Sequence, residues 1–571
     1  MNILLSLGHN ASAITTDEDK IVRSGFEEER LNRIKSCSNF PQLAIDACLQ
    51  HTETGPGYIY ISHWFDDFNF WRNGFADKHW TPDAIKHLSQ KYDLSIVSLT
   101  PQFTHHDAHA WAALAFYESH SAAVPDTGMY VAVADGFGNR EEVFSLYRYS
   151  EKSDSLDLVH RIHGYEHSLG LIYQYATSYC GMKENQDEYK FLGYESHVSS
   201  ILSPAEMEQF QHEAWLWADN IASATNTQPS ENAVYIDVSR LAATRAELWA
   251  TFDQPIFNIC RKTKDQFSKQ DLRKIIGYFV QCIIENFYSR IIADFDIVNI
   301  VVTGGLHYNV KLNNHILANI TGEFCATPLA GDQGAAIGLM RYNENRVSGL
   351  NSLLWGQRDL SYDHEDGTQI QPGVYYFSNE ENYVDFVAKR INEGLLVNTI
   401  TGRMEFGPRA LCNTSTLALP SEKNVMDINA LNGRDTVMPM APVIHEANAH
   451  EFFNPADMAR VVGSLDFMIL TLDYHSTLDI ARFRGVAHPY PRFGQKSGYS
   501  GRPQIVRASS TQPIHKILGQ VQSPALINTS LNVHGVPIVY SADDAIHDHA
   551  YNVKLAQEQG LPLPLLVIGN F

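Results

Sequence analysis

Short apolar runs that end in turns of small and polar residues recur through the first half of the chain. Residues 3–7, 129–134 and 297–302 are such runs, and they lead into turns that contain Gly8, Asp135-Gly136 and Gly304-Gly305. Stretches of helical character separate these runs, at residues 44–50, 109–117, 169–179 and 274–292. Strands that alternate with helices predict an α/β fold, in which ligands bind beyond the carboxyl ends of the strands.

The character of the chain changes between residues 345 and 375, where Gly, Ser, Asp and Pro indicate connecting loops. A helix over residues 384–394 with a glycine stop follows, and then a strand over residues 395–400. We therefore predict two domains, residues 1–355 and residues 356–571. The sequence contains no fixed-period repeat and no low-complexity tract.

Three histidines lie within five residues, in the segment His105-His106-Asp107-Ala108-His109. Because His105 and His109 are four residues apart, their rings share one face of a helix, and that spacing suits a transition metal. Asp135 and Asp332, both in turns, are the candidate carboxylate ligands. The plainer alternatives are a histidine-rich helix start at the surface and ordinary turn aspartates.

Polar and cationic loops mark the rest of the chain. Glycine turns at residues 8–13, 135–138, 304–305 and 331–334 match neither a P-loop nor a dinucleotide-binding fingerprint. Residues 402–411 carry two arginines in a loop that Gly and Pro constrain, and a third arginine lies at 502. Arginine recognises phosphate with two parallel hydrogen bonds, so these loops predict phosphate-binding pockets. Residues 528–532, Asn-Thr-Ser-Leu-Asn, form either a plain turn or an oxyanion-binding lip.

Charge and cysteine usage narrow the function classes. The 571 residues include 43 Lys and Arg against 65 Asp and Glu, a formal net charge of −22. This balance argues against broad non-specific binding of nucleic acid or anionic lipid, but it leaves a local basic pocket open. No run of 18 apolar residues predicts a membrane span, and no signal peptide is evident. The seven scattered cysteines contain no Cys-x-x-Cys pair, which favours reduced thiols in a cytoplasmic protein.

These motifs, taken in order, resemble those of the O-carbamoyltransferase family, which includes the nodulation-factor, cephem and aminoglycoside carbamoyltransferases. The resemblance covers nearly the whole chain. Its pieces are His9-Asn10-Ala11-Ser12-Ala13, Glu27-Glu28-Glu29-Arg30, residues 105–110, Ala134-Asp135-Gly136, Ser168-Leu169-Gly170, Glu188-Tyr189-Lys190 with Gly193, Gly304-Gly305 with Asn309 and Asn313, Asp332 with Gly334, residues 402–411, Arg502-Pro503-Gln504 and residues 528–532.

The resemblance implies an α/β chain of two domains. The first is an actin-like/Hsp70-like ATPase fold of the TsaD-like type, and the second is a smaller α/β domain of the YrdC-like type. It also implies an ATP-dependent transferase. Carbamoyl phosphate and ATP form carbamoyl-adenylate in the second domain, and the first domain transfers the carbamoyl group to a hydroxyl of an acceptor. AMP is a good leaving group, and passage within one chain protects the intermediate from water.

The same resemblance assigns roles to individual residues. The metal ligands are His105, His109, Asp135 and Asp332, with Fe²⁺ or Mn²⁺ as the metal, and Mg²⁺ accompanies ATP. Nucleotide-binding residues are Gly136, Gly138, Gly193, Gly304, Gly305 and Asn309. Catalytic residues are His9, as the general base, Lys190 and Arg409. Carbamoyl phosphate and ATP are bound by Arg403, Arg409, Ser415, Arg434, Arg502, Asn528, Ser530 and Asn532. Lys190 has a plainer alternative as a solvated helix end.

The second domain departs from the family pattern at several positions, among them Asn432, where the family has a lysine. The family continues residues 408–411 with Gly-Asn-Arg-Ser, whereas this chain has Cys412 and Thr414 at the Gly and Arg positions, and Met438 replaces a further arginine. Either the pocket is impaired, or other cations rebuild it, with Lys423, Arg434 and Arg507 as the candidates. We favour rebuilding because the loop at residues 402–411 is intact.

Two other functions stay open at this stage. One is a metal- and nucleotide-binding module with a degenerate YrdC-like domain that acts in an assembly. The other, a hydrogenase-maturation carbamoylase, is disfavoured because its acylphosphatase and zinc-finger segments are missing. The acceptor is open among a small molecule, a sugar and a hydroxymethylated nucleotide or DNA base. Formation of a homodimer is also open.

Overall fold

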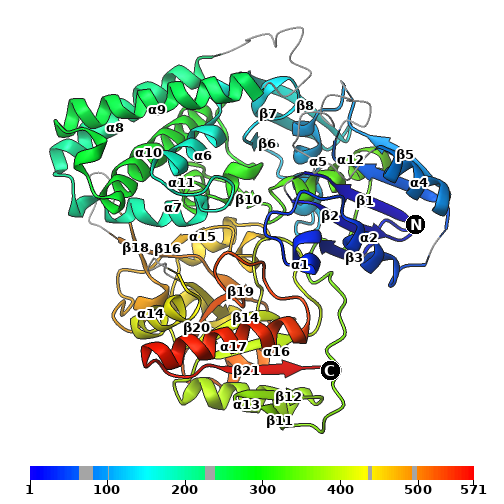
Figure 1. The fold of residues 1–571 in the computed structure, drawn as a ribbon. Helices are drawn as coiled ribbons and strands as arrows, with labels where there is room; N and C mark the ends of the chain where they lie inside the picture. Colours follow the sequence, from blue (N-terminus) through cyan, green and yellow to red (C-terminus); the bar gives the residue numbers. More distant parts are fainter. Residues whose placement is uncertain are drawn as a thin grey trace.

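The computed structural model describes residues 1–8, 10–53, 55–63, 82–100, 102–224, 238–434, 440–490 and 498–571 (Figure 1). Three large sheets organise these residues, and a three-stranded sheet of β16 (Leu472–Asp473), β18 (Gly498–Gly501) and β17 (His488–Tyr490) accompanies the third. None of the helices in these ranges is both long and apolar enough to cross a membrane.

The first sheet has the strand order β3-β2-β1-β4-β5. Its strands are β1 (Asn2–Ser6), β2 (Ser12–Thr16), β3 (Val22–Glu27), β4 (Gly57–Ile61) and β5 (Leu94–Ser98). Strands β1, β2 and β3 are antiparallel neighbours, whereas β4 and β5 run parallel to β1. The short helix α1 (Glu28–Asn32) and α2 (Gln42–Leu49) follow β3, and α4 (Pro82–Tyr92) precedes β5.

The second sheet repeats this arrangement, with the order β8-β7-β6-β9-β10. Its strands are β6 (Met129–Ala134), β7 (Glu142–Ser150), β8 (Ser155–His163), β9 (Ile300–Thr303) and β10 (Phe324–Ala326). Again three antiparallel strands precede two parallel ones. The sequence shows no repeat, so this duplication is visible only in the topology. Paired sheets of this kind are the arrangement expected of an actin-like fold, and the predicted α/β class is confirmed.

Two helices pack face to face between these sheets. Helix α5 (His105–Glu118) contacts β6 and β9, and α12 (Ala335–Glu344) contacts β1 and β4. A further layer of helices adjoins the second sheet (Figure 1). It contains α6 (Leu169–Tyr179), α7 (Glu188–Tyr194), α8 (Pro204–Ala222), α9 (Val238–Cys260), α10 (Lys269–Asp294) and α11 (Val310–Asn319). The apolar residues of α10 are buried at the centre of this layer.

The third sheet has eight strands in the order β11-β12-β21-β13-β14-β20-β15-β19. They are β11 (Thr368–Gln371), β12 (Val374–Phe377), β13 (Val397–Thr401), β14 (Thr414–Ala418), β15 (Ala441–His445), β19 (Gln504–Val506), β20 (Ala525–Ser530) and β21 (Leu565–Gly569). Helices of this part are α13 (Glu380–Asn392), α14 (Glu422–Leu431), α15 (Pro455–Arg460), α16 (Pro513–Gln520) and α17 (Ala542–Gln559).

Polar contacts, some of them buried, join the third sheet region to the first. The Glu27 carboxylate accepts a hydrogen bond from the Gly407 amide (3.2 Å), and Arg30 Nη2 donates to the Gly407 carbonyl (2.5 Å). Arg403 Nη2 donates to the main-chain carbonyls of Arg23 and Trp355, both at 2.7 Å. These contacts fix the loop at residues 402–411 against the end of β3 and the start of α1.

Candidate functional site

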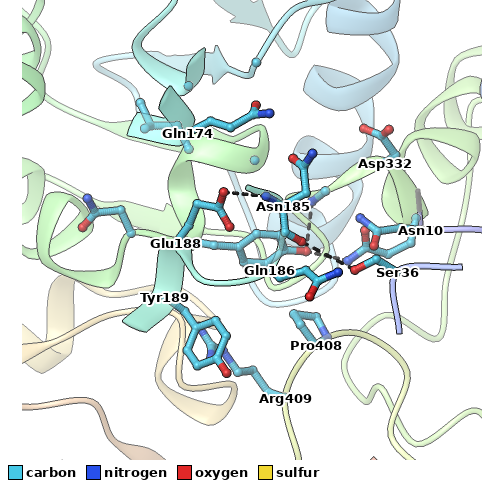
Figure 2. A pocket seen from close by; sticks show the side chains of 18 of the residues that line it. Asn10, Ser36, Gln174, Asn185, Gln186, Glu188, Tyr189, Asp332, Pro408 and Arg409 are labelled. Atoms are coloured by element: carbon cyan, nitrogen blue, oxygen red, sulfur yellow. Dashed lines mark hydrogen bonds between the residues drawn. The ribbon is translucent and has the colours of Figure 1, made fainter. Parts of the chain in front are cut away.

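A single cavity of about 700 Å³ extends from the ends of β1 and β6 to the loops of the third sheet. Asp332 lies on one side of it and Arg409 on another, with polar side chains of the loop before α7 between them (Figure 2). The end with the predicted metal ligands and the end with the predicted phosphate-binding arginines are therefore parts of one continuous cavity.

Four potential metal ligands converge at one end of this cavity. The nitrogen and oxygen donors of His105, His109, Asp135 and Asp332 all lie within 4.8 Å of one another. His105 Nε2 is 3.3 Å from both carboxylates and 3.0 Å from His109 Nε2. Two imidazole nitrogens and two carboxylate oxygens suit a divalent transition metal.

Local structure places each of these ligands. The Thr104 side chain and Asp107 form a capping box that starts α5 at His105, which confirms the predicted histidine pair on one helix. Asp135 follows β6 directly, and its Oδ1 accepts the Gly136 and Gly305 amides at 2.8 and 3.1 Å, so Oδ2 is left toward the histidines. Asp332 begins a 3-10 turn that leads into α12.

The charges of this cluster depend on each other. Burial lowers the pKa of His105, but hydrogen bonds to Asp135 and Asp332 outweigh it and raise the pKa to about 10. Burial in turn raises the pKa of Asp135, and its contact with His105 brings the pKa below the usual value. The imidazole and the carboxylates therefore share a proton at neutral pH, and a metal ion would have to displace it.

Most of the predicted nucleotide-binding glycines line the cavity, namely Gly136, Gly138, Gly193 and Gly305. Gly304 does not; it has φ +93°, and a Cβ there would lie 2.2 Å from the Ala134 carbonyl. Asn309 lines the cavity, but its Oδ1 caps α11 and its Nδ2 donates to Gln281 (2.8 Å). Both residues therefore support the site. Gly304 allows the close approach of the Ala134 main chain, and the Asn309 side chain caps α11.

Lys190 is buried, so the plainer interpretation of a solvated helix end is wrong. Its Nζ lies 2.6 Å from the Asp187 carboxylate and 3.1 Å from His534 Nε2, which comes from the loop after β20. This cation therefore links α7 to the third sheet region at the cavity wall.

Three arginines line the other end of the cavity without an ion pair in the part of the chain that the structure describes. They are Arg409, Arg434 and Arg502. Burial lowers the pKa of each, and mutual repulsion with Arg409 lowers that of Arg502 further. Burying a cation without a neighbouring carboxylate costs free energy unless an anion binds to it. This end of the cavity therefore suits an anionic ligand.

The other residues predicted to bind carbamoyl phosphate and ATP divide into two sets. Asn528, Ser530 and Asn532 line the cavity, and Ser530 donates to Asn532 Oδ1 at 2.6 Å. Arg403 and Ser415 are not among the lining residues, because Arg403 binds the carbonyls of residues 23 and 355 and the Ser415 hydroxyl accepts the Cys412 amide (3.2 Å). His9 and Met438 lie outside the described residues.

The three cations expected to compensate for the departures from the family pattern lie in different places. Arg434 lines the cavity, but Lys423 pairs with Asp427, and Arg507 pairs with Asp466 and Glu446, away from the cavity lining. Sequence reasoning missed Arg358, which donates to the carbonyls of Gly402, Thr401, Asn413 and Tyr540 and to the Thr414 hydroxyl. No local motif around Arg358 signals this role.

Glu405 is a second residue that sequence reasoning passed over. Its Oε1 accepts the amides of Leu411, Asn413 and Thr414 at 2.8, 3.0 and 3.0 Å, so it shapes the loop that carries Arg409. A carboxylate in the middle of an otherwise cationic loop was the available signal.

Family models and known relatives match most of this chain. The model of the carbamoyltransferase N-terminus matches residues 74–340, and that of the carbamoyltransferase C-terminus matches residues 388–556. The nodulation protein NolNO of Sinorhizobium fredii (strain NBRC 101917 / NGR234) is 25% identical over 94% of this chain and 76% of its own length. The 3'-hydroxymethylcephem-O-carbamoyltransferase of Amycolatopsis lactamdurans is 26% identical over 43% of this chain and 44% of its own length.

Among solved structures, the T. kodakarensis HypF matches 61% of this chain and 48% of its own chain, at 13% identity and a TM-score of 0.28. A TM-score this low does not establish a shared fold. The two family models together span most of the sequence, in the order of their names. The chain therefore belongs to the O-carbamoyltransferase family, and it is an enzyme.

Proposed function

We propose that the protein is an ATP-dependent O-carbamoyltransferase that forms carbamoyl-adenylate and passes its carbamoyl group to an acceptor hydroxyl. The observation that carries the proposal is the shared cavity. Three arginines without an ion pair among the described residues line one end, and the cluster of His105, His109, Asp135 and Asp332 lies at the other. Phosphate-rich substrates fit the first end, and the second fits a divalent metal such as Fe²⁺ or Mn²⁺.

The first half-reaction belongs to the arginine end. Hydrolysis of carbamoyl phosphate gives carbamate and phosphate, a carbamate oxygen then bonds to the α-phosphorus of ATP, and pyrophosphate leaves. Arg409, Arg434 and Arg502 would bind the phosphates of both substrates, since each guanidinium can donate two parallel hydrogen bonds. Mg²⁺ would accompany ATP.

The second half-reaction belongs to the end with the metal ligands. The acceptor oxygen attacks the carbamoyl carbon, the bond from that carbon to the AMP oxygen breaks, and the hydroxyl proton passes to a base, for which we propose His9. A metal held by His105, His109, Asp135 and Asp332 would offset the negative charge of the adenylate phosphate. Because one cavity spans both ends, the intermediate need not cross bulk water.

Pyrophosphate release that requires both carbamoyl phosphate and ATP tests the first half-reaction. Arg409→Gln should reduce it at least about 100-fold, because a charge-assisted contact to the anionic substrates is lost in a buried site. Arg346→Gln is the matched control, since that side chain is 61% exposed and lies away from the cavity. A module that only binds metal and nucleotide would release no pyrophosphate in any variant.

His109→Ala separates the two half-reactions. It should leave pyrophosphate release intact and block transfer, which a screen of hydroxyl compounds detects as a gain of about 43 Da on the acceptor. If His109→Ala stops pyrophosphate release as completely as Arg409→Gln does, the division of labour between the two ends is wrong. The same screen decides among small-molecule, sugar and hydroxymethylated nucleotide or DNA-base acceptors.

A further inference from the structure

Asn528 holds a buried hydrogen-bond acceptor that the folded chain does not use. Its side chain is 1% exposed and lies on β20, at the edge of the cavity. The amide nitrogen donates to the Ala410 carbonyl (3.0 Å) and to Gln504 Oε1 (2.6 Å), and Met468 Sδ lies 3.9 Å away. The oxygen Oδ1 has no partner in the described ranges.

The orientation of this amide is fixed by its neighbours. Ala410 offers a main-chain carbonyl, which can only accept, so the nitrogen of Asn528 must face it. Gln504 Oε1 also accepts from Cys412 Sγ (3.2 Å), which holds the Gln504 oxygen toward Asn528. A flipped amide would place oxygen against oxygen in both contacts. Asn528 therefore presents Oδ1 on the side away from Ala410 and Gln504.

The position of Asn528 links this acceptor to the anion-binding end. Ala410, which it binds, directly follows Arg409, and Arg409, Arg434 and Asn528 all line the same cavity. A phosphate held by these arginines would bring whatever is attached to it close to Asn528. In carbamoyl phosphate that attachment is a carbonyl carbon that carries an NH₂ group, a donor of the kind that Oδ1 lacks.

We propose that Asn528 Oδ1 accepts a hydrogen bond from the carbamoyl NH₂ and thereby selects carbamoyl phosphate over acyl phosphates without an N–H. This inference rests on the proposed function, because it names the substrate group that the same cavity reads. The arginines recognise the phosphate, which all acyl phosphates share, so they cannot make this distinction. A site with a fixed polar partner rejects an analogue that leaves the partner unpaired.

Acetyl phosphate is the discriminating probe, because a methyl group replaces the NH₂ at nearly the same size. Binding of each phosphate to the full-length protein is read from the ligand-dependent rise in Tm, which needs no turnover. The wild-type protein should bind carbamoyl phosphate on the order of tenfold to a hundredfold more tightly than acetyl phosphate. Equal affinities in the wild-type protein would overturn the inference without any variant.

Asn528→Leu keeps a similar volume and removes the acceptor, so the affinity ratio should fall to near one. Arg502→Gln is the matched control: it should weaken both phosphates by a similar factor and keep the ratio. A ratio that survives in Asn528→Leu would contradict the role. Pyrophosphate release, measured separately, reports on the proposed function itself. If it is absent while the affinity ratio is intact, the proposed function is wrong, and the role of Asn528 in binding the carbamoyl group still holds.

The adenine amino group of ATP is the other N–H donor in the reaction. ATP and purine riboside triphosphate, which lacks that amino group, distinguish the two sources. Asn528→Leu should weaken neither nucleotide relative to the other. A change in their ratio without a change in the carbamoyl-to-acetyl ratio would assign Oδ1 to adenine and overturn the proposal.

Discussion

Thr414 stands where the family pattern led us to expect an arginine, and its hydroxyl accepts a hydrogen bond from Arg358 Nη1 (3.0 Å). The same guanidinium binds four main-chain carbonyls, and burial lowers the pKa of Arg358 to about 10. A cation therefore does reach position 414, but it supports the loop instead of facing the cavity. Arg434 is the expected compensating cation that does line the cavity.

Asp332 is the metal-cluster ligand chosen for removal, because the Asp135 carboxylate also holds the Gly136 and Gly305 amides. We expect Asp332→Ala to lower Fe²⁺ or Mn²⁺ affinity at least about 100-fold, because only three donors remain. Metal content after gel filtration, read by plasma emission, checks this. His547→Ala, at an 88% exposed side chain, should retain full metal content. Wild-type protein that binds neither ion would refute the site.

Glu142 should impose a pH dependence on stability. Its carboxylate lies 2.7 Å from Arg161, which Asp107 shares at 3.1 Å. Burial, which outweighs the attraction of Arg161, raises the pKa of Glu142 to about 7 from 4.5. The folded protein keeps a proton that the unfolded chain loses, so this contribution falls as pH rises from 4.5 to about 7, by up to roughly 3 kcal/mol.

Tm measured from pH 5 to pH 8 tests this effect. Glu142→Gln should flatten part of the fall in Tm below pH 7, because the amide does not titrate. Glu18→Gln, at an exposed position, should leave the profile unchanged. Identical profiles for the wild-type protein and Glu142→Gln would show that another group is responsible.

At the scale of elements, the close contact between α5 and α12 brings the metal ligands together. A Cβ on Gly338 would lie 1.8 Å from the Ala108 carbonyl and 2.6 Å from the Ala112 amide. Only glycine allows the two helix backbones to approach this closely. The approach sets Asp332, just before α12, against the histidines at the start of α5.

Gly338→Ala should therefore lower both stability and metal binding. Main-chain atoms cannot move aside as a side chain can, so we expect a loss of about 1–3 kcal/mol or more. Unfolding by denaturant and metal content measure the two effects. Gly519→Ala in α16 has no atom within 4 Å of the new Cβ and should be neutral or stabilise by up to about 1 kcal/mol. Unchanged stability in Gly338→Ala would contradict this packing.

At the scale of the whole molecule, one buried pair aligns the two ends of the cavity. Arg30 and Glu27 bind each other at 3.1 Å, and together they hold both main-chain polar groups of Gly407, two residues before Arg409. Burial raises the pKa of Glu27 even beside Arg30. Loss of the arginine would thus leave a buried acid without its partner.

Arg30→Ala should destabilise the protein by about 3–5 kcal/mol, since it breaks a buried ion pair. It should also slow pyrophosphate release, because Arg409 loses its support. Arg23→Ala removes an exposed pair with Asp17 and should cost no more than about 1 kcal/mol. Equal losses in the two variants, measured by denaturant unfolding, would show that Arg30 does not have this special role.

Much of the secondary structure follows from local sequence patterns. The runs at residues 129–134 and 169–179 form β6 and α6 with the predicted bounds, and residues 274–292 lie within α10. Apolar periodicity and turn residues act within a few positions, so they are readable from the sequence. The histidine pair on α5 is local in the same way, and its spacing alone predicted a shared face.

Local sequence patterns were enough to predict the α/β class, the helix that presents His105 and His109, and the family motifs. Tertiary packing sets the duplicated sheets, the continuous cavity between the two candidate binding ends, and which arginines lack an ion pair in the described part of the chain. Arg403 and Arg409 are six residues apart in one loop, yet one binds distant carbonyls and the other lines the cavity. The two arginines differ because the main-chain carbonyls of Arg23 and Trp355 come close to Arg403 only when the chain is folded.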